Sequence, residues 1–171
     1  MKRLLLFLPV LLLQACFEVP PPPDSLPPVT MSGENTFGMQ VNGVNWVPAV
    51  AHAGLFALPT VEVVYHEGTF FLMVQRPVEG GVQQLVLDID SVVVNETLFF
   101  DSENLEIDFY DYPQDCYYDL PIAGSITFSR LDTAANIAAA TFEFFVASSD
   151  STCATMELTE GRFDYEMDYY Y

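Results

Sequence analysis

Short stretches in which apolar and polar side chains alternate constrain the fold of this chain more than any other feature. Residues 83–90, 105–110 and 163–169 each place apolar side chains on one face and polar, mainly acidic ones on the other. A period of two residues with one polar face is typical of antiparallel strands whose sheet has one side in water. After residue 15, no stretch carries the apolar stripe of a three-turn helix. The pattern therefore predicts an all-β protein.

Turn signals separate the expected strands. Asn42-Gly43 and Glu67-Gly68 each lie between two strand-like stretches and predict hairpins. Residues 155–169 fit either one long strand or a hairpin around Glu160-Gly161. We expect about eight to ten strands, arranged as an antiparallel β-sandwich or a flattened barrel. Trp46, the single tryptophan, is interpreted as a core or hairpin-packing residue.

The N-terminus carries the pattern of an export signal. Lys2 and Arg3 precede an apolar run, and Cys16 follows the small residue Ala15. The run is too short for a membrane-spanning helix, which needs about 20 apolar residues. Residues 13–16 resemble the lipobox of bacterial lipoprotein precursors. This resemblance implies cleavage before Cys16 and attachment of fatty acid such as palmitate to its thiol, whereas an ordinary secretory signal is the alternative.

Composition divides the chain into three parts. Residues 1–15 are expected to be a lipoprotein signal peptide. Residues 16–35 are rich in proline, which fixes φ and lacks a hydrogen-bond donor, so this part is expected to be an extended tether. Residues 36–171 are enough for a single β-domain that buries its own core.

The charge balance excludes one class of partner. The chain has 24 acidic and 5 basic residues, and loss of residues 1–15 would leave Arg76, Arg130 and Arg162 as its basic side chains. Nucleic-acid affinity comes largely from Lys and Arg that displace counterions from phosphates, so we expect no nucleic acid partner. Membrane attachment is expected through the lipid on Cys16 and not through a basic patch.

Three cysteines leave an even pair if Cys16 is acylated. A disulfide between Cys116 and Cys153 is then expected in an exported protein, and it would close a long loop. Two free thiols are the alternative. Neither cysteine has a partner at metal-ligand spacing, so we expect no zinc site.

Tyrosines beside carboxylates gather around residues 111–120, which we interpret as a loop. Such rings stack on sugars while the carboxylates accept hydrogen bonds from hydroxyl groups, and tyrosines are also favoured in protein interfaces. Some of them are alternatively sheet-covering or core residues. The residues of the expected ligand site are Tyr110, Tyr112, Tyr117 and Tyr118.

The abundant carboxylates of the chain suggest a metal site, and the usual sequence signals of catalysis are missing. Carboxylates are the hard oxygen ligands that calcium requires, and solvated surface carboxylates are the alternative. The chain has no G-x-S-x-G turn, and its two histidines, His52 and His66, are not expected to be catalytic, so we do not expect an enzyme. The candidate calcium ligands are Asp88, Asp90, Asp108, Asp111 and Asp115.

Several short motifs carry a family resemblance. Residues 124–128 (GSITF), 140–144 (ATFEF) and 160–164 (EGRFD) resemble the closing strands of uncharacterised bacteroidete lipoproteins, and residues 36–46 resemble their opening hairpin. The resemblance implies an outer-membrane lipoprotein, on the periplasmic or the cell-surface side. It implies no activity and no site residue.

Three hypotheses for function remain at this point. The first is a non-catalytic, lipid-anchored envelope β-domain that acts as a structural or binding module for a glycan or protein partner. The second is a lipocalin-like carrier that encloses an apolar ligand. The third is a hydrolase that uses carboxylates. A binding module needs an exposed aromatic patch, a carrier an enclosed cavity, and a hydrolase a cleft with convergent carboxylates.

Overall fold

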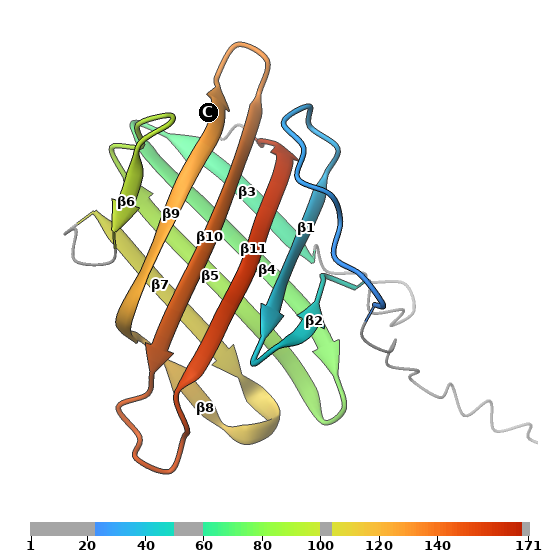
Figure 1. The fold of residues 1–171 in the computed structure, drawn as a ribbon, viewed down its shortest axis with the longest axis vertical. Helices are drawn as coiled ribbons and strands as arrows, with labels where there is room; N and C mark the ends of the chain where they lie inside the picture. Colours follow the sequence, from blue (N-terminus) through green and yellow to red (C-terminus); the bar gives the residue numbers. More distant parts are fainter. Residues whose placement is uncertain (1–22, 50–59, 100–103, 169–171) are drawn as a thin grey trace, which may run out of the picture.

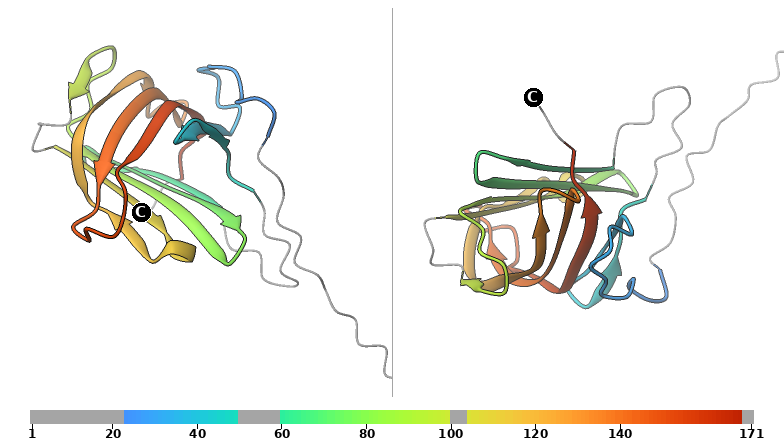
Figure 2. Two further views of the ribbon diagram at one scale, coloured as in Figure 1. Left: turned by 60° about the horizontal axis from the view of Figure 1, so that its bottom comes forward. Right: turned by 90° about the horizontal axis from the view of Figure 1, so that it is seen from above.

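The computed structural model describes residues 23–49, 60–99 and 104–168, which form two antiparallel sheets (Figure 1). Figure 2 shows the sheets as two layers that face each other. Because they do not close on one another, the β-sandwich is confirmed and the flattened barrel is not. Cys16, His52 and the terminal tyrosines lie outside the described residues, as do all of residues 1–15 and 50–59.

Six strands form the first sheet. In spatial order they are β2 (Val44–Trp46), β1 (Thr36–Val41), β11 (Met156–Glu166), β10 (Ile137–Ala147), β9 (Leu120–Asp132) and β6 (Thr97–Phe99). The hairpin predicted around Asn42-Gly43 is confirmed as β1 and β2. Residues 156–166 form one strand and not a hairpin, because β11 pairs with β10 both before and after an irregularity near Glu160-Gly161.

Five strands form the second sheet. In spatial order they are β3 (Val61–His66), β4 (Thr69–Val78), β5 (Gly81–Asp90), β7 (Leu105–Asp111) and β8 (Cys116–Tyr118). The hairpin predicted around Glu67-Gly68 is confirmed. The loop interpretation of residues 111–120 was wrong: they contain the 3₁₀ turn η1 (Tyr112–Gln114), the short strand β8 and the start of β9. Within the described ranges, no helix is long and apolar enough to cross a membrane.

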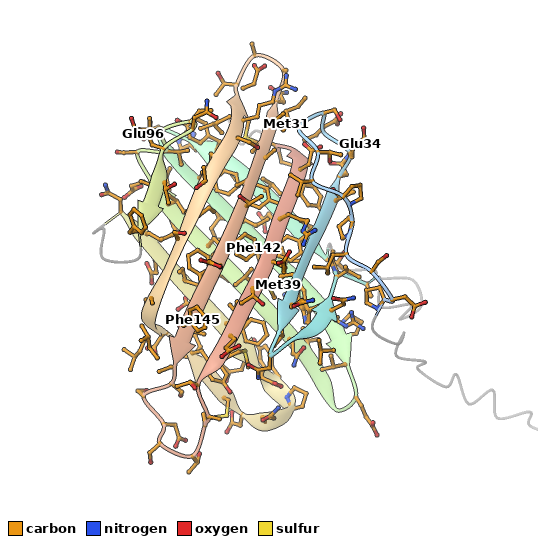
Figure 3. The ribbon with its side chains drawn as sticks, in the orientation of Figure 1. Met31, Glu34, Met39, Glu96, Phe142 and Phe145 are labelled. Carbon is orange, nitrogen blue, oxygen red and sulfur yellow. A yellow bond between two sulfur atoms is a disulfide. The ribbon has the colours of Figure 1, made fainter. Side chains whose placement is uncertain are left out.

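The alternating pattern places aromatic rings between the sheets. Phe70 of β4 stacks on Phe163 of β11 with ring centroids 5.4 Å apart, and the ring of Phe128 meets both edge to face. Trp46 is buried, packs against Phe37 and donates from its indole nitrogen to Gln83. Its interpretation as a core residue is therefore confirmed. Buried side chains of both sheets form one contiguous core, and Figure 3 draws the side chains over the ribbon.

A disulfide joins the two sheets at one end. Cys116 of β8 is bonded to Cys153, which lies between β10 and β11, and their Cα atoms are 5.9 Å apart. The predicted disulfide is confirmed. It ties the shortest strand of the five-stranded sheet to a loop of the six-stranded sheet.

The proline-rich segment also belongs to the folded body. Residues 23–35, which we call the docked arm, form no strand, as their prolines predict, yet contact the six-stranded sheet along their length. The arm runs beside β1 in Figure 1, and Figure 3 places Met31 and Glu34 near the start of that strand. The expected tether of residues 16–35 is thus a docked segment from residue 23 onward.

Candidate functional site

Three of the four predicted tyrosines meet on the outer face of the five-stranded sheet. Tyr110 of β7 lies directly opposite Tyr117 of β8, with ring centroids 5.5 Å apart. The ring of Tyr112 lies 4.1 Å from that of Tyr110. Together with neighbouring side chains they line a depression of about 200 Å³, which we call the tyrosine pocket. Its lining residues are Gln84, Val86, Asp108, Tyr110, Tyr112 and Tyr117.

The local sequence explains how the chain presents these rings. Pro113 fits the start of the 3₁₀ turn η1, since its fixed φ suits the first helical positions. Asp115 ends the turn in the left-handed conformation with φ 52°, which reverses the chain and lets β8 return along β7. The turn packs against the β4–β5 hairpin, where a Cβ on Gly81 would lie 3.3 Å from Pro113. Tyr112 is therefore held against a rigid hairpin.

Tyr117 is linked to the acidic side of the pocket. Its hydroxyl donates a hydrogen bond to the carboxylate of Asp108. Partial burial, this hydrogen bond and the negative charges of Asp108, Asp119 and Glu106 raise the pKa of Tyr117 to about 12. The phenol is thus a hydrogen-bond donor beside the carboxylate at physiological pH.

An amide completes the polar lining. Gln75 donates a hydrogen bond to the side-chain oxygen of Gln84 at 3.1 Å. Gln84 can therefore offer its amide nitrogen as a donor to a ligand. Asp108 offers acceptor oxygens on the next strand, and Val86 of β5, directly opposite Asp108, adds an apolar surface. Rings, a donor amide and an acceptor carboxylate on one sheet face have the chemistry needed to stack on a polyhydroxylated ring and to hydrogen-bond its hydroxyl groups.

Tyr118 is not part of the pocket. It is 3% exposed and its ring packs against Phe109 in the core, with centroids 6.2 Å apart. Because residues 116–118 form a strand, successive side chains point to opposite faces, and Tyr118 faces inward where Tyr117 faces outward. Tyr118 therefore lies apart from the other three predicted tyrosines and outside the tyrosine pocket.

The five predicted calcium ligands do not come together. Asp88 and Asp90 lie on the outer face of β5, and Thr69 donates to Asp90. Asp111 is buried on the core side, where its Oδ2 accepts from Gln83 and Gln114 at 2.9 and 3.0 Å. In the part of the chain that the structure describes, no group of three acidic, histidine or cysteine side chains is placed to hold a metal ion. Asp108 lies beside Tyr117 in the tyrosine pocket. Asp115 lies at the end of η1.

Asp88 nonetheless has an unusual environment. Partial burial and the neighbouring charge of Asp90 raise its pKa above the ordinary range of a carboxyl group. His66, at the end of β3, has an exposed side chain 3.8 Å from Glu67, as expected for a strand-end histidine. Neither residue lines the tyrosine pocket.

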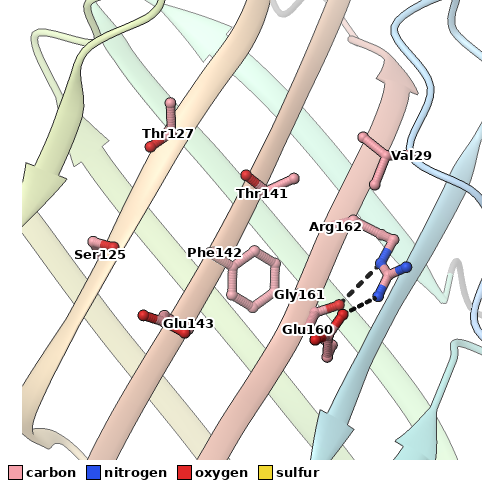
Figure 4. A pocket seen from close by; sticks show the side chains of 9 residues that line it. All are labelled: Val29, Ser125, Thr127, Thr141, Phe142, Glu143, Glu160, Gly161 and Arg162. Atoms are coloured by element: carbon pink, nitrogen blue, oxygen red, sulfur yellow. Dashed lines mark hydrogen bonds and ion pairs between the residues drawn. The ribbon is translucent and has the colours of Figure 1, made fainter.

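A larger depression lies on the other sheet and has a different character. About 280 Å³ in size, it is lined by hydroxyl groups of β9 and β10 and by the charged pair Glu160 and Arg162 (Figure 4). Arg162 already donates to Glu160 at 3.0 Å and to the carbonyl of Pro27. Phe142, the aromatic residue of its lining, is buried. The tyrosine pocket differs in having exposed rings, among them that of Tyr112, which is 54% exposed.

Comparison with known proteins adds no analogy for this site. No family model, no curated protein and no solved structure shows significant similarity to the chain. Gln84 and Val86 were not predicted as site residues, because only the pairing of β5 with β7 places them beside Asp108 and Tyr110. The alternation of side chains along residues 83–90 was the sequence signal that Gln84 and Val86 share the outward face.

Proposed function

We propose that this protein is a non-catalytic, lipid-anchored module of the outer envelope that binds a glycan through the tyrosine pocket. The observation that carries the proposal is that three outward-facing tyrosine rings line one depression together with Asp108 and Gln84 on a single sheet face. The anchoring part of the proposal depends on the lipobox-like residues before Cys16. The outer membrane is the location that the family resemblance suggests.

The charge of the molecule favours a neutral or basic ligand. Asp88 and Glu106 lie opposite one another on the same sheet face as Asp108, so an anionic glycan would meet like charges. The pocket is smaller than the roughly 300–1,000 Å³ that a drug-sized ligand fills. It therefore suits one neutral sugar unit at a time, with the rest of a glycan chain lying along the sheet.

The carrier hypothesis and the hydrolase hypothesis have less support from the structure. A carrier needs an enclosed apolar cavity, whereas the space between these sheets holds fully buried rings such as Phe70, Phe109 and Phe128. A hydrolase needs convergent carboxylates, whereas Asp108 of the pocket is hydrogen-bonded to Tyr117 and Asp111 faces the core. A binding module requires only the exposed aromatic surface.

Titration with neutral oligosaccharides tests the binding proposal. Tyr112→Ala should weaken binding about tenfold, which corresponds to about 1.4 kcal/mol of stacking energy. Phe99→Ala is the matched control, since Phe99 is an exposed aromatic residue at the edge of the other sheet and should leave binding unchanged. Equal affinity of both variants would contradict the proposed site. Mass spectrometry of the native protein tests acylation of Cys16 separately.

A further inference from the structure

The docked arm is held by a buried carboxylate. Asp164 of β11 is 1% exposed and accepts hydrogen bonds from the backbone amides of Ser32, Gly33 and Glu34 at 2.9, 2.8 and 3.3 Å. The hydroxyl of Thr30 lies near the same carboxylate but falls short of hydrogen-bond geometry. Hydrogen bonds to a charged acceptor are stronger than neutral ones, and here three of them converge on one segment. This end of the arm is therefore firmly attached.

The rest of the arm is held by carbonyl contacts. Arg130 donates to the carbonyl of Met31 at 2.7 Å, and Arg162 donates to that of Pro27 at 3.4 Å. Asn45 of β2 donates to the carbonyl of Pro23 at 3.1 Å. These contacts extend from residue 23 to residue 34, so the first described residue of the chain is already attached to the sandwich.

Close packing supports the same conclusion. Pro27 lies directly over Gly38 of β1, where an added Cβ would be 2.6 Å from the proline Cδ. Gly33, with φ 81°, turns the arm toward Ile137 and Glu166 before β1 begins. The sheet is shaped to receive the arm, since a larger residue at position 38 would displace it.

This attachment limits how far the sandwich can lie from a lipid on Cys16. Only the chain from Cys16 to Pro23 separates the two points, and seven residue steps span at most about 25 Å when fully extended. Release of the whole arm would lengthen the connection to residue 35, which allows about 65 Å. The docked arm therefore removes more than half of the reach that an unattached tether would provide.

We infer that the docked arm keeps the β2 corner of the sandwich, where Asn45 binds Pro23, close to the surface of the lipid bilayer. The occupant of this surface is the bilayer itself, because the acylated residue is so near in the chain. The corner presents Val44, which is 55% exposed and adjacent to Asn45, as an apolar contact. The inference rests on the proposed acylation of Cys16.

Energy transfer from Trp46 to dansyl-labelled lipid in neutral phosphatidylcholine vesicles tests this inference on the full acylated protein. Trp46 is the single tryptophan and follows Asn45 in β2, so it reports directly on this corner. An insertion of ten Gly and Ser residues after Glu18 leaves every arm contact in place and lengthens only the connection. Transfer should be strong in the unmodified protein and fall about twofold or more with the insertion.

Asp164→Asn provides a second variant, because loss of the carboxylate should release the arm and lower transfer in the same way. Glu143→Gln, an exposed change on the same sheet outside the arm contacts, is the control and should leave transfer unchanged. Transfer that is equal with and without the insertion, in protein that remains bound to vesicles, would overturn the inference while acylation still stands. Protein that fails to associate with vesicles and lacks fatty acid by mass spectrometry would instead overturn the proposed anchoring.

Discussion

The outer faces of the two sheets differ sharply, although both arise from strands with the same two-residue alternation. On the six-stranded sheet, Asp164, Arg130 and Arg162 face outward and bind the backbone of the docked arm. On the five-stranded sheet, Tyr110 and Asp108 face outward and line the tyrosine pocket. Alternation decides which side chains leave the core. It does not decide whether those side chains meet water, a ligand or another segment of the same chain.

Removal of the disulfide between the sheets should have the largest effect on the free energy of unfolding. Replacement of both Cys116 and Cys153 by Ser opens a loop with a sequence separation of 37 residues. The expected loss in the free energy of unfolding is about 4 kcal/mol from chain entropy, measured by urea denaturation. Glycan affinity should fall as well, since Cys116 precedes Tyr117 in β8. Equal stability of the oxidised and reduced wild-type protein would contradict this expectation.

The same substitution on the two outer faces should have opposite consequences. Asp164→Asn leaves three buried amides without their charged acceptor and should lower the free energy of unfolding by about 3 kcal/mol. Asp88→Asn removes a carboxylate whose raised pKa shows that its charged form is disfavoured, so stability should stay constant or rise slightly. Thermal melting of both variants compares the faces directly. Equal loss of stability in both variants would show that the arm contacts of Asp164 stabilise the fold no more than the surface carboxylate of Asp88 does.

Acid should release the arm by protonating Asp164. Burial alone would raise the pKa of Asp164, but the Thr30 hydroxyl and the amides of Gly33, Ser32 and Glu34 outweigh it and lower the pKa below the ordinary value. A lowered pKa in the folded state stabilises the protein above the unfolded value of about 3.9. This stability is lost as pH falls through the folded pKa. The protection of the Ser32 and Gly33 amides against hydrogen exchange, relative to their intrinsic exchange rates, should therefore fall below pH 4, and Asp164→Asn should abolish that dependence.

Crowding on the inner side of the six-stranded sheet should have a smaller effect on the free energy of unfolding. A Cβ on Gly161 would lie 2.3–2.5 Å from ring atoms of Phe142, so Gly161→Ala forces the ring to move and should cost about 2 kcal/mol. Gly43→Ala is the control, since φ is 78° there but no atom lies within 4 Å of the added Cβ. Its cost should be about 1 kcal/mol, from backbone strain alone. Denaturant midpoints of the two variants separate crowding from strain.

The smallest effect on stability should come from Tyr117→Phe. The variant loses one hydrogen bond at the surface, which is worth less than about 1 kcal/mol at neutral pH. The raised pKa of Tyr117, about 12 in the folded protein, contributes stability that is present below the unfolded value of about 10 and is lost as pH rises to 12. Tyr165, whose pKa burial also raises to about 12, serves as the reference on the other sheet. Absorbance titration should show one fewer phenolate forming near pH 12 in the variant.

Parts of the site were predictable and parts were not, for a physical reason. The clustering of tyrosines and acids around residue 112 is visible in the chain, and so is the pair of cysteines that secures β8. Whether Tyr117 or Tyr118 faces outward depends on the register of a three-residue strand, and that register is set by pairing with β7. A short strand carries too little alternation of its own to reveal it.

The amino-acid sequence by itself determined the all-β class, the main hairpins and the disulfide partners, because alternation, turn residues and an even cysteine count act over short distances or by simple exclusion. Tertiary structure decided that the proline-rich segment is docked and that Asp164 is buried beneath it. The hydrogen bond from Ser32 to Asp164 joins residues 132 positions apart, and no local pattern at either end specifies the other. Long-range contacts of this kind form only when the sheets place the two segments side by side.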